Sequence, residues 1–192
     1  MRYFTADLHL GHANIIRYCR RPFPTVGAMN GALIANWTEI VRGDDEVWVL
    51  GDVAMGRITE TLPLVAKLPG RKHLVPGNHD RCWPGHSCVR PEHVAIYEDV
   101  GFTIHPPMVR TELGGHEVLL CHLPVAGDSR DADRYGQHRP MLDADTWLLH
   151  GHVHEKWRVE GRQINVGVDV WDYRPVAESA LLGLIAQGGQ QR

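Results

Sequence analysis

The sequence has no long apolar segment. Its longest apolar runs, such as residues 47–50 and 180–182, are far too short to span a bilayer. Residues 1–11 also lack the basic and then apolar layout of a signal peptide. We therefore expect a cytoplasmic protein with no membrane partner.

Cysteine is also scarce. The four cysteines form no CxxC pair, which argues against a disulfide framework in a chain of 192 residues; they are Cys19, Cys82, Cys88 and Cys121. Cys82 and Cys88, together with His86, would give a small zinc site only three ligands at a non-standard spacing. We predict instead a plain loop that begins just after His79 and shapes the wall of a pocket.

Acidic and basic residues are also nearly balanced in number. The net charge is -3 with histidine neutral, which gives no strong attraction to nucleic acid or to an anionic membrane. A nucleic acid substrate therefore remains open but is not indicated. With 43% hydrophobic and 22% charged residues, the chain has the composition of a globular protein. Its length predicts one domain over residues 1–192.

Hydrophobic periodicity predicts alternating strands and helices in the first half of the chain and mostly strands in the second. Strands are expected at 2–6, 46–50, 72–75, 102–110, 117–121 and 147–150, with a hairpin at 156–168. Helices are expected at 31–42, 58–68 and 93–100, and a closing helix at 177–187, although its apolar run also suits a strand. This order predicts an α/β fold with a mixed sheet or two packed sheets.

Histidine is abundant, with 13 residues in the chain, and many of them stand beside Asp, Asn or Gly just after an apolar strand. The clusters are Asp7-x-His9, Gly51-Asp52, Gly77-Asn78-His79-Asp80, His122 and Gly151-His152-Val153-His154. Open α/β sheets place ligand sites at the carboxyl ends of their strands. Carboxylate, imidazole and amide donors together suit Mn²⁺, Fe or Zn²⁺ rather than Ca²⁺ or a structural thiolate zinc site.

The number of these donors indicates two ions. Seven ligands are too many for one tetrahedral ion and suit two ions, about 3.5–4 Å apart, that share a bridging carboxylate and hold a hydroxide between them. In extended backbone, the i and i+2 pairs Asp7/His9 and His152/His154 point to the same side. The glycines before Asp52, Asn78 and His152 allow sharp turns and close approach of the ligands.

The ordered pattern DxH…GD…GNHD…H…GHxH, from residue 7 to 154, resembles the calcineurin-like metallophosphoesterase superfamily. The DLHLGHANI opening, the GDS…DRY…HRP loop and the NVGVD…YRP ending resemble its small, single-domain bacterial branch. The resemblance implies two mixed β-sheets packed as a sandwich and flanked by helices.

The resemblance also implies a role for each matching residue. Asp7, His9 and His154 would hold one metal ion. Asn78, His122 and His152 would hold the other, and Asp52 would bridge the two. The cofactors would be two divalent transition-metal ions, Mn²⁺ first, with Fe or Zn²⁺ as alternatives. His79 would act beside the leaving oxygen as a general acid or charge stabiliser, and Asp80 would orient its imidazole.

Other polar residues allow two interpretations each. His12 contacts a metal or phosphate, or it caps the helix that follows. The candidate substrate-binding residues of the loop before the last cluster are Arg130, Arg134, Tyr135, His138 and Arg139. Asp128, Asp131 and Asp133 nearly cancel the charge of the arginines, which favours a solvated loop, but an arginine there could also grip phosphate through its planar fork. We expect His150, Asp169, Trp171 and Tyr173 to be structural.

These observations predict a hydrolase of phosphate esters in which a metal-bridging hydroxide attacks phosphorus in line. A chain this short has little room for a lid, so an open site favours phosphodiesters. The alternatives are a phosphomonoesterase with the same site and a non-catalytic scaffold on the same fold. The expected partner is a small phosphate ester or nucleotide.

Overall fold

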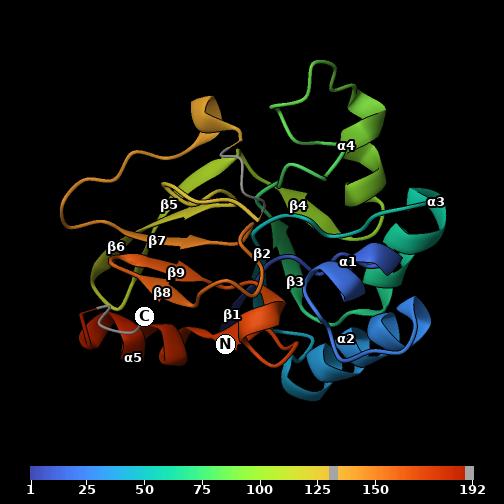
Figure 1. Ribbon diagram of the computed structural model, residues 1–192, viewed down its shortest axis with the longest axis horizontal. Helices are drawn as coiled ribbons and strands as arrows, with labels where there is room; N and C mark the ends of the chain where they lie inside the picture. The colour runs from blue at the N-terminus through green and yellow to red at the C-terminus, as the bar shows by residue number, and fades with distance from the viewer. Residues whose placement is uncertain (130–133, 189–192) are drawn as a thin grey trace.

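Two five-stranded sheets pack face to face in the computed structural model, which describes residues 1–129 and 134–188 (Figure 1). The strands of the first sheet, in spatial order, are β10 (Val176–Ala177), β1 (Arg2–Thr5), β2 (Glu46–Val49), β3 (Arg71–Leu74) and β4 (Phe102–Ile104). Those of the second are β5 (Met108–Leu113), β6 (His116–Cys121), β7 (Trp147–His150), β9 (Gln163–Asn165) and β8 (Val159–Glu160). Each sheet contains both parallel and antiparallel pairs, so the predicted α/β fold with two mixed sheets is confirmed.

Helices connect the parallel strands of the first sheet. Between β1 and β2 lie α1 (Ala13–Tyr18) and α2 (Val26–Ile40), and between β3 and β4 lies α4 (Pro91–Glu98). The predicted helix at 58–68 is instead a short α-helix, α3 (Ile58–Thr61), followed by the 3₁₀ helix η1 (Leu62–Lys67). Pro63 has no N–H group to continue the α-helical hydrogen bonding, which accounts for the change of helix type.

The predicted strand at 102–110 is wrong, because it is two strands in different sheets. β4 ends at Ile104 and β5 begins at Met108. Pro106 and Pro107 lie between them and cannot donate to a sheet ladder, so the chain leaves the first sheet there and enters the second. The hairpin predicted within 156–168 is confirmed by the antiparallel pair β8 and β9, and the closing helix by α5 (Glu178–Ala186).

Three apolar clusters hold these layers together. Alternation along β2 turns Val47 and Val49 toward the helices and Trp48 and Leu50 toward the core between the sheets. Leu181 of α5 joins that inter-sheet core. A third cluster on the far face of the second sheet includes Trp83, Leu119, Cys121, Leu123 and Leu148. The helices thus cover the first sheet, and loop residues cover the outer face of the second.

The loops that follow the strands are joined to one another by backbone hydrogen bonds. The N–H of Asp7 donates to the carbonyl of Gly51 (3.1 Å), and that of His9 donates to the carbonyl of Asp52 (2.9 Å). In the second sheet, the N–H of Gly151 donates to the carbonyl of His122 (3.0 Å). These bonds bring together the carboxyl ends of β1, β2, β6 and β7, where the predicted ligands stand.

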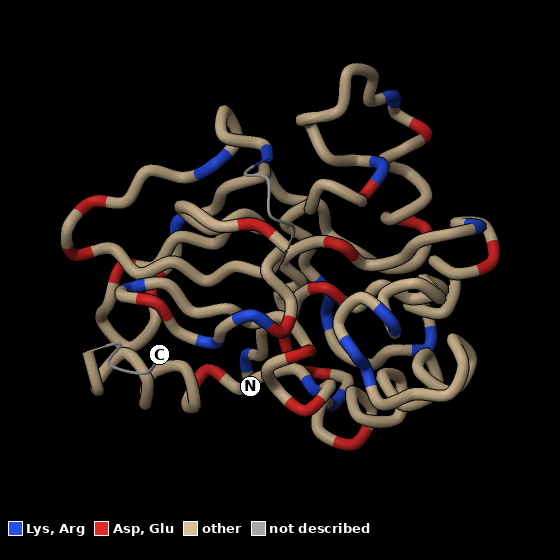
Figure 2. The backbone as a smooth tube through the Cα atoms, viewed as in Figure 1, with Lys and Arg blue, Asp and Glu red and all other residues tan. Residues whose placement is uncertain are grey.

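Acidic and basic residues are interspersed over most of the described chain (Figure 2). This distribution agrees with the mild net charge of -3. No helix formed by residues 1–129 and 134–188 is long and apolar enough to cross a membrane. The cytoplasmic location stays a prediction.

Candidate metal centre

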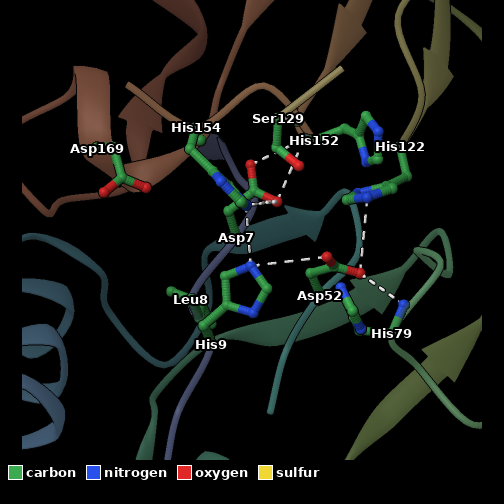
Figure 3. A network of polar contacts seen from close by, with 12 residues as sticks. Asp7, Leu8, His9, Asp52, His79, His122, Ser129, His152, His154 and Asp169 are labelled. Carbon is green, nitrogen blue, oxygen red and sulfur yellow. Dashed lines mark hydrogen bonds and ion pairs between the residues drawn. The ribbon is translucent and has the colours of Figure 1, made fainter. Parts of the chain in front are cut away.

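The first group of predicted ligands meets where β1, β2 and β7 end (Figure 3). His9 Nε2 lies 3.1 Å from His154 Nε2 and 3.6 Å from Asp52 Oδ2. Asp7 Oδ1 lies 3.9 Å from His154 Nε2. Each of these four residues offers a ligand atom within 4.8 Å of the others, which is close enough for one cation to reach all four.

The second group lies on the other side of Asp52. Asn78 Oδ1 is 3.0 Å from His122 Nε2 and 2.9 Å from His152 Nδ1. Asp52 Oδ1 is 3.6 Å from His122 Nε2, whereas Asp52 Oδ2 faces His9 of the first group. One buried carboxylate therefore presents its two oxygens to two different sets of ligand atoms, and the structure brings all seven predicted ligands together.

The donor atoms of the second group fit a cation. His122 Nδ1 lies 2.8 Å from the carbonyl oxygen of Leu50, which can only accept, so Nδ1 carries a proton. Burial lowers the pKa of His122, but the carboxylates of Asp52 and Asp7 outweigh it and raise the pKa overall, which favours a ring that also carries a proton on Nε2. Asn78 Oδ1 accepts from that nitrogen at 3.0 Å, and Asn78 Nδ2 donates to the Tyr135 hydroxyl at 3.4 Å. A metal cation could take the place of the Nε2 proton between the two ligand atoms.

The backbone at the site is held in an uncommon conformation. Five of the seven ligands are non-glycine residues with positive φ; they are Asp7 (56°), His9 (50°), Asp52 (56°), His152 (72°) and His154 (51°). Such residues are uncommon and cost free energy unless their surroundings hold them. Their concentration here indicates that ligand placement, rather than local backbone preference, determines these loops.

The glycines beside the ligands permit close approach, as predicted. Gly51 has a φ of 83°, and a Cβ atom there would lie 2.5 Å from the Cα of Gly77. A Cβ on Gly77 would lie 2.4 Å from Asp52 Oδ1, and one on Gly151 would lie 2.7 Å from Asp7 Oδ2. A side chain at Gly77 or Gly151 would displace a carboxylate of the site, and one at Gly51 would displace the loop of Gly77.

Burial keeps several imidazoles neutral. It lowers the pKa of His9 well below its ordinary value, that of His152 to about 4 and that of His154 to about 3. Neighbouring imidazoles lower the pKa of His9 and His152 further. A neutral imidazole has the lone pair that a metal ligand needs, so these three side chains are ready to coordinate at neutral pH.

The two carboxylates of the site behave differently. Burial raises the pKa of Asp7 to about 8, although the charge of His122 opposes the rise. Burial also raises the pKa of Asp52, but the imidazoles of His122 and His79 outweigh it, so that its pKa is lowered overall. Asp52 is therefore an anion between the two ligand groups, in the position that a bridging ligand would occupy.

Asp80 is buried beneath this site and bonds mainly to backbone. Its carboxylate oxygens accept hydrogen bonds from the N–H groups of Asp52 (2.8 Å), Val53 (3.1 Å) and Gly77 (2.8 Å), and from the hydroxyl of Tyr97 (3.3 Å). It thus joins the loop after β2 to the loop after β3. Its role in orienting the His79 imidazole stays a prediction.

His79 is exposed, unlike the candidate metal ligands around it. Its backbone N–H donates to Asp52 Oδ1 (2.9 Å), and its ring centroid lies 5.7 Å from that of His9. The imidazole therefore lies at the solvent side of the two ligand groups, where a substrate would arrive.

A cavity of about 570 Å³ opens beside the first ligand group. Its lining residues are His9, His12, Ile15, Tyr18, Cys19, Met55, His79, Ser129, Arg134, His154 and Glu155. His12 stands at the N-cap position of α1, but its side chain makes no capping hydrogen bond, so the capping interpretation is wrong. Instead its Nδ1 atom is buried without a hydrogen-bond partner while the residue lines the cavity.

The predicted substrate-binding residues of the loop between His122 and Gly151 lie in different surroundings. Arg134 lines the cavity and pairs with Asp128 at 2.6 Å. Arg139 is largely buried and donates to the carbonyls of Pro124 and Arg134, and His138 packs on Trp83 with ring centroids 4.8 Å apart. Tyr135 accepts from Asn78, as noted above, and Arg130 lies outside the described residues. Substrate contacts by these residues stay a prediction.

Asp128 was expected to be part of a solvated loop, and this expectation is wrong. Its side chain is only 1% exposed, and Oδ2 lies 3.2 Å from His152 Nε2. The same carboxylate pairs with Arg134 and with Arg139, the latter at 3.7 Å. Carboxylates that contact the outer nitrogen of a metal-binding histidine fix its ring orientation and tautomer. No local sequence pattern indicates this long-range contact.

Arg21 is a second residue that sequence reasoning missed. Its guanidinium is buried and donates to the carbonyls of Asp7 (2.7 Å) and Leu8 (3.1 Å). It also forms a two-point ion pair with Asp169, at 2.8 and 2.7 Å. The structural role expected for Asp169 is thus confirmed, and its pairing with Arg21 holds the backbone of the first metal ligand.

The loop after His79 contains no zinc site. Cys82 is buried, Cys88 is exposed, and both are free thiols. Neither belongs to a group of metal-ligating side chains within residues 1–129 and 134–188. Trp83 packs its ring against those of Tyr135 and His138, at 5.4 and 4.8 Å, so the loop supports the residues beside the cavity.

Comparison with known proteins places these features in a wider group. Residues 4–170 match the calcineurin-like phosphoesterase superfamily domain. The Gene 66 protein of Mycobacterium phage L5 is 35% identical over 183 residues, which are 88% of this chain and 86% of the phage protein. An uncharacterized protein of Methanocaldococcus jannaschii is 30% identical over 195 residues, covering 97% of this chain and 92% of that one. A solved structure of a protein of unknown function from Aquifex aeolicus has a TM-score of 0.70 at 27% identity and covers 96% of this chain and 98% of its own.

Proposed function

The chain belongs to the calcineurin-like phosphoesterase superfamily, and from that premise we propose that it is a phosphodiesterase that works with two divalent transition-metal ions. The observation that carries the proposal is the position of Asp52. Its Oδ2 lies 3.6 Å from His9 Nε2 and its Oδ1 lies 3.6 Å from His122 Nε2. A single carboxylate between two sets of ligand atoms is the arrangement that a pair of ions requires.

The seven ligands divide between the two proposed ions. Asp7, His9 and His154 would hold the first. Asn78, His122 and His152 would hold the second, with Asp52 shared. Bound ions would lower the pKa of the attacking water and neutralise the phosphoryl oxygens. Mixed nitrogen and oxygen donors favour Mn²⁺, with Fe or Zn²⁺ as alternatives.

His79 is proposed to protonate the leaving oxygen. It lines the cavity, it is exposed, and its backbone N–H donates to Asp52, so its imidazole lies within reach of a substrate at the proposed ions. General acid catalysis matters most when the leaving group is a poor one. His79→Ala should therefore slow the release of an alkoxide by about 100-fold or more and the release of p-nitrophenolate much less.

The charges that line the cavity support a diester. Arg134 is already paired with Asp128, and Glu155 adds a carboxylate to the lining. A phosphodiester carries a single negative charge, whereas a phosphomonoester carries nearly two at neutral pH. Glu155 would repel the second charge, so it disfavours the monoester.

Steady-state rates with bis-p-nitrophenyl phosphate and p-nitrophenyl phosphate, measured after Mn²⁺ loading, test this preference. We expect the higher kcat/KM for the diester. Glu155→Gln keeps the shape of the side chain and removes its charge, and it should raise the relative rate of the monoester. A wild-type preference for the monoester would show that the site is a phosphomonoesterase.

Metal content separates the enzyme from a scaffold on the same fold. After Mn²⁺ loading, elemental analysis should find two equivalents in the wild type and a loss of metal and activity in Asp52→Ala. Fewer than two equivalents in the wild type, together with no ester hydrolysis, would support the scaffold instead.

A further inference from the structure

The cavity beside the metal centre has two chemically different walls. One wall carries the imidazoles of His9, His79 and His154. The other is formed by α1, which contributes Ile15, Tyr18 and Cys19, and is completed by Met55. The first wall suits a phosphate group, whereas the second consists mostly of apolar and aromatic surface.

The α1 wall, meaning Ile15, Tyr18, Cys19 and Met55, is poorly suited to phosphate oxygens. Apart from the Tyr18 hydroxyl, its aliphatic and sulfur-containing side chains offer no strong hydrogen-bond donors, and desolvating a phosphate against them would be costly. The wall therefore suits the carbon-rich part of a phosphate ester whose phosphate lies at the imidazoles.

Tyr18 extends this wall toward solvent. It is 56% exposed, although it is a large aromatic residue and its neighbour on the same helix face, Ile15, is buried. The guanidinium of Arg17 lies 5.5 Å from the ring centroid, and the His12 ring meets it edgewise at 6.2 Å. An exposed aromatic ring at the edge of a cavity is the element that proteins use to stack flat rings.

We propose that the α1 wall is the subsite for a flat aromatic group on the substrate, with Tyr18 as the residue that stacks on it. The proposal rests on the phosphodiesterase function argued above and names the class of ester that the site prefers. The cavity of about 570 Å³ lies within the usual range for sites that enclose a whole small molecule, so an aromatic ring and a phosphate can be held together.

Two ligands that differ only in the flat ring provide the test. Adenosine monophosphate and ribose 5-phosphate share the sugar phosphate, and only the first carries a base. Their dissociation constants are measured by calorimetry on Mn²⁺-loaded protein, and their inhibition constants are measured against bis-p-nitrophenyl phosphate. We expect the wild type to bind adenosine monophosphate about tenfold more tightly, because stacking on one aromatic side chain has about that effect.

Three variants assign the difference to the ring of Tyr18. Tyr18→Ala should bind the two ligands equally, while Tyr18→Phe should keep the tenfold gap because it keeps the aromatic face. Met141→Ala is the control, since Met141 is 92% exposed and does not line the cavity. Phenyl phosphate and methyl phosphate form a second pair, which shows whether a simple aryl ring is sufficient or a nucleobase is needed.

The outcomes separate this proposal from the proposed function. Equal affinities in the wild type for both members of both pairs, or a gap that persists in Tyr18→Ala, would overturn the aromatic subsite even if esters are hydrolysed. Failure of every phosphate compound to bind, with no turnover, would instead overturn the phosphodiesterase function and the subsite with it.

Discussion

Asp128→Asn tests how the proposed metal ligand His152 is held in place. The side chain of Asp128 is 1% exposed, its Oδ2 lies 3.2 Å from His152 Nε2, and its Oδ1 lies 2.6 Å from Arg134. The asparagine has nearly the same shape but carries no charge. It can place an amide N–H group where His152 needs an acceptor, so the imidazole loses the partner that fixes its tautomer.

The expected loss of metal affinity follows from the position of Asp128, which contacts a candidate ligand but is not one of the seven. Loss of a carboxylate that supports a metal-binding histidine costs about 10- to 100-fold in metal affinity. That corresponds to about 1.4–2.8 kcal/mol of binding free energy. The ion proposed to be held by His152 should be affected most, since His152 is the candidate ligand that Asp128 contacts.

The substitution should also reduce folding stability. Arg139 has a side chain that is 5% exposed and lies 3.7 Å from Asp128, so it would lose this ion pair inside the protein. Breaking a buried ion pair by removing one partner costs about 3–5 kcal/mol, and the hydrogen-bonding capacity of asparagine should keep the loss below that range.

The assay is a calorimetric titration of metal-free protein with Mn²⁺, combined with urea denaturation of the same samples. Asp143→Asn is the matched control, because Asp143 is 78% exposed and pairs with the exposed Arg110 at 3.3 Å. The control should change neither metal affinity nor stability measurably. If Asp128→Asn binds two Mn²⁺ ions with wild-type affinity, the argument that Asp128 holds His152 is refuted.

Three further predictions concern the site and the sheet. Gly77→Ala should weaken metal binding and destabilise the fold by about 1–3 kcal/mol in urea denaturation, because its Cβ would lie 2.4 Å from Asp52 Oδ1; Gly136→Ala, with open space around it, should not. Burial lowers the pKa of His73 and of His105, whose ring nitrogens lie 3.0 Å apart, so the unfolded chain binds more protons below pH 6.5. The stability that the neutral His73 and His105 contribute is therefore fully present above pH 6.5 and is lost as the pH falls. His73→Gln should make the urea midpoint fall less steeply between pH 7 and 5, and an unchanged slope would contradict this. Removal of metal with a chelator should lower Tm, and added Mn²⁺ should restore it. Mn²⁺ at 100 times its dissociation constant should add about 2.7 kcal/mol to the free energy of unfolding. A Tm that changes in neither treatment would argue against a metal site.

Much of the metal centre could be predicted because its ligands occur in short local patterns. Asp52 and Asn78 each follow a glycine within a few residues of the end of a strand, and His122 directly follows another strand, so strand prediction alone brings them to one edge. The two sheets were predictable from strand order for the same reason. The family resemblance then supplied the division of ligands between two ions, which no local pattern contains.

The features that were missed depend on contacts between distant parts of the chain. Arg21 holds the backbone of Asp7 only because Asp169, 148 residues away in sequence, completes its ion pair. Asp128 looked like one acid among several in a charged loop, and its burial follows from tertiary packing. The break between β4 and β5 was missed because apolar periodicity continues on both sides of the two prolines.

The left-handed backbone of the proposed metal ligands sets stability and function against each other. At φ values of 50° and 72°, His9 and His152 hold an unfavourable conformation worth about 1 kcal/mol or more. Glycine would relieve this strain but would leave a cavity in place of a buried imidazole. Where the site can collapse around that cavity, the metal-free protein could become more heat-stable by losing its proposed ligands. Laboratory evolution that selects for folding alone should first replace the residues at this edge of the sheets. Thermostable variants should therefore be screened for bound metal as well as for melting temperature.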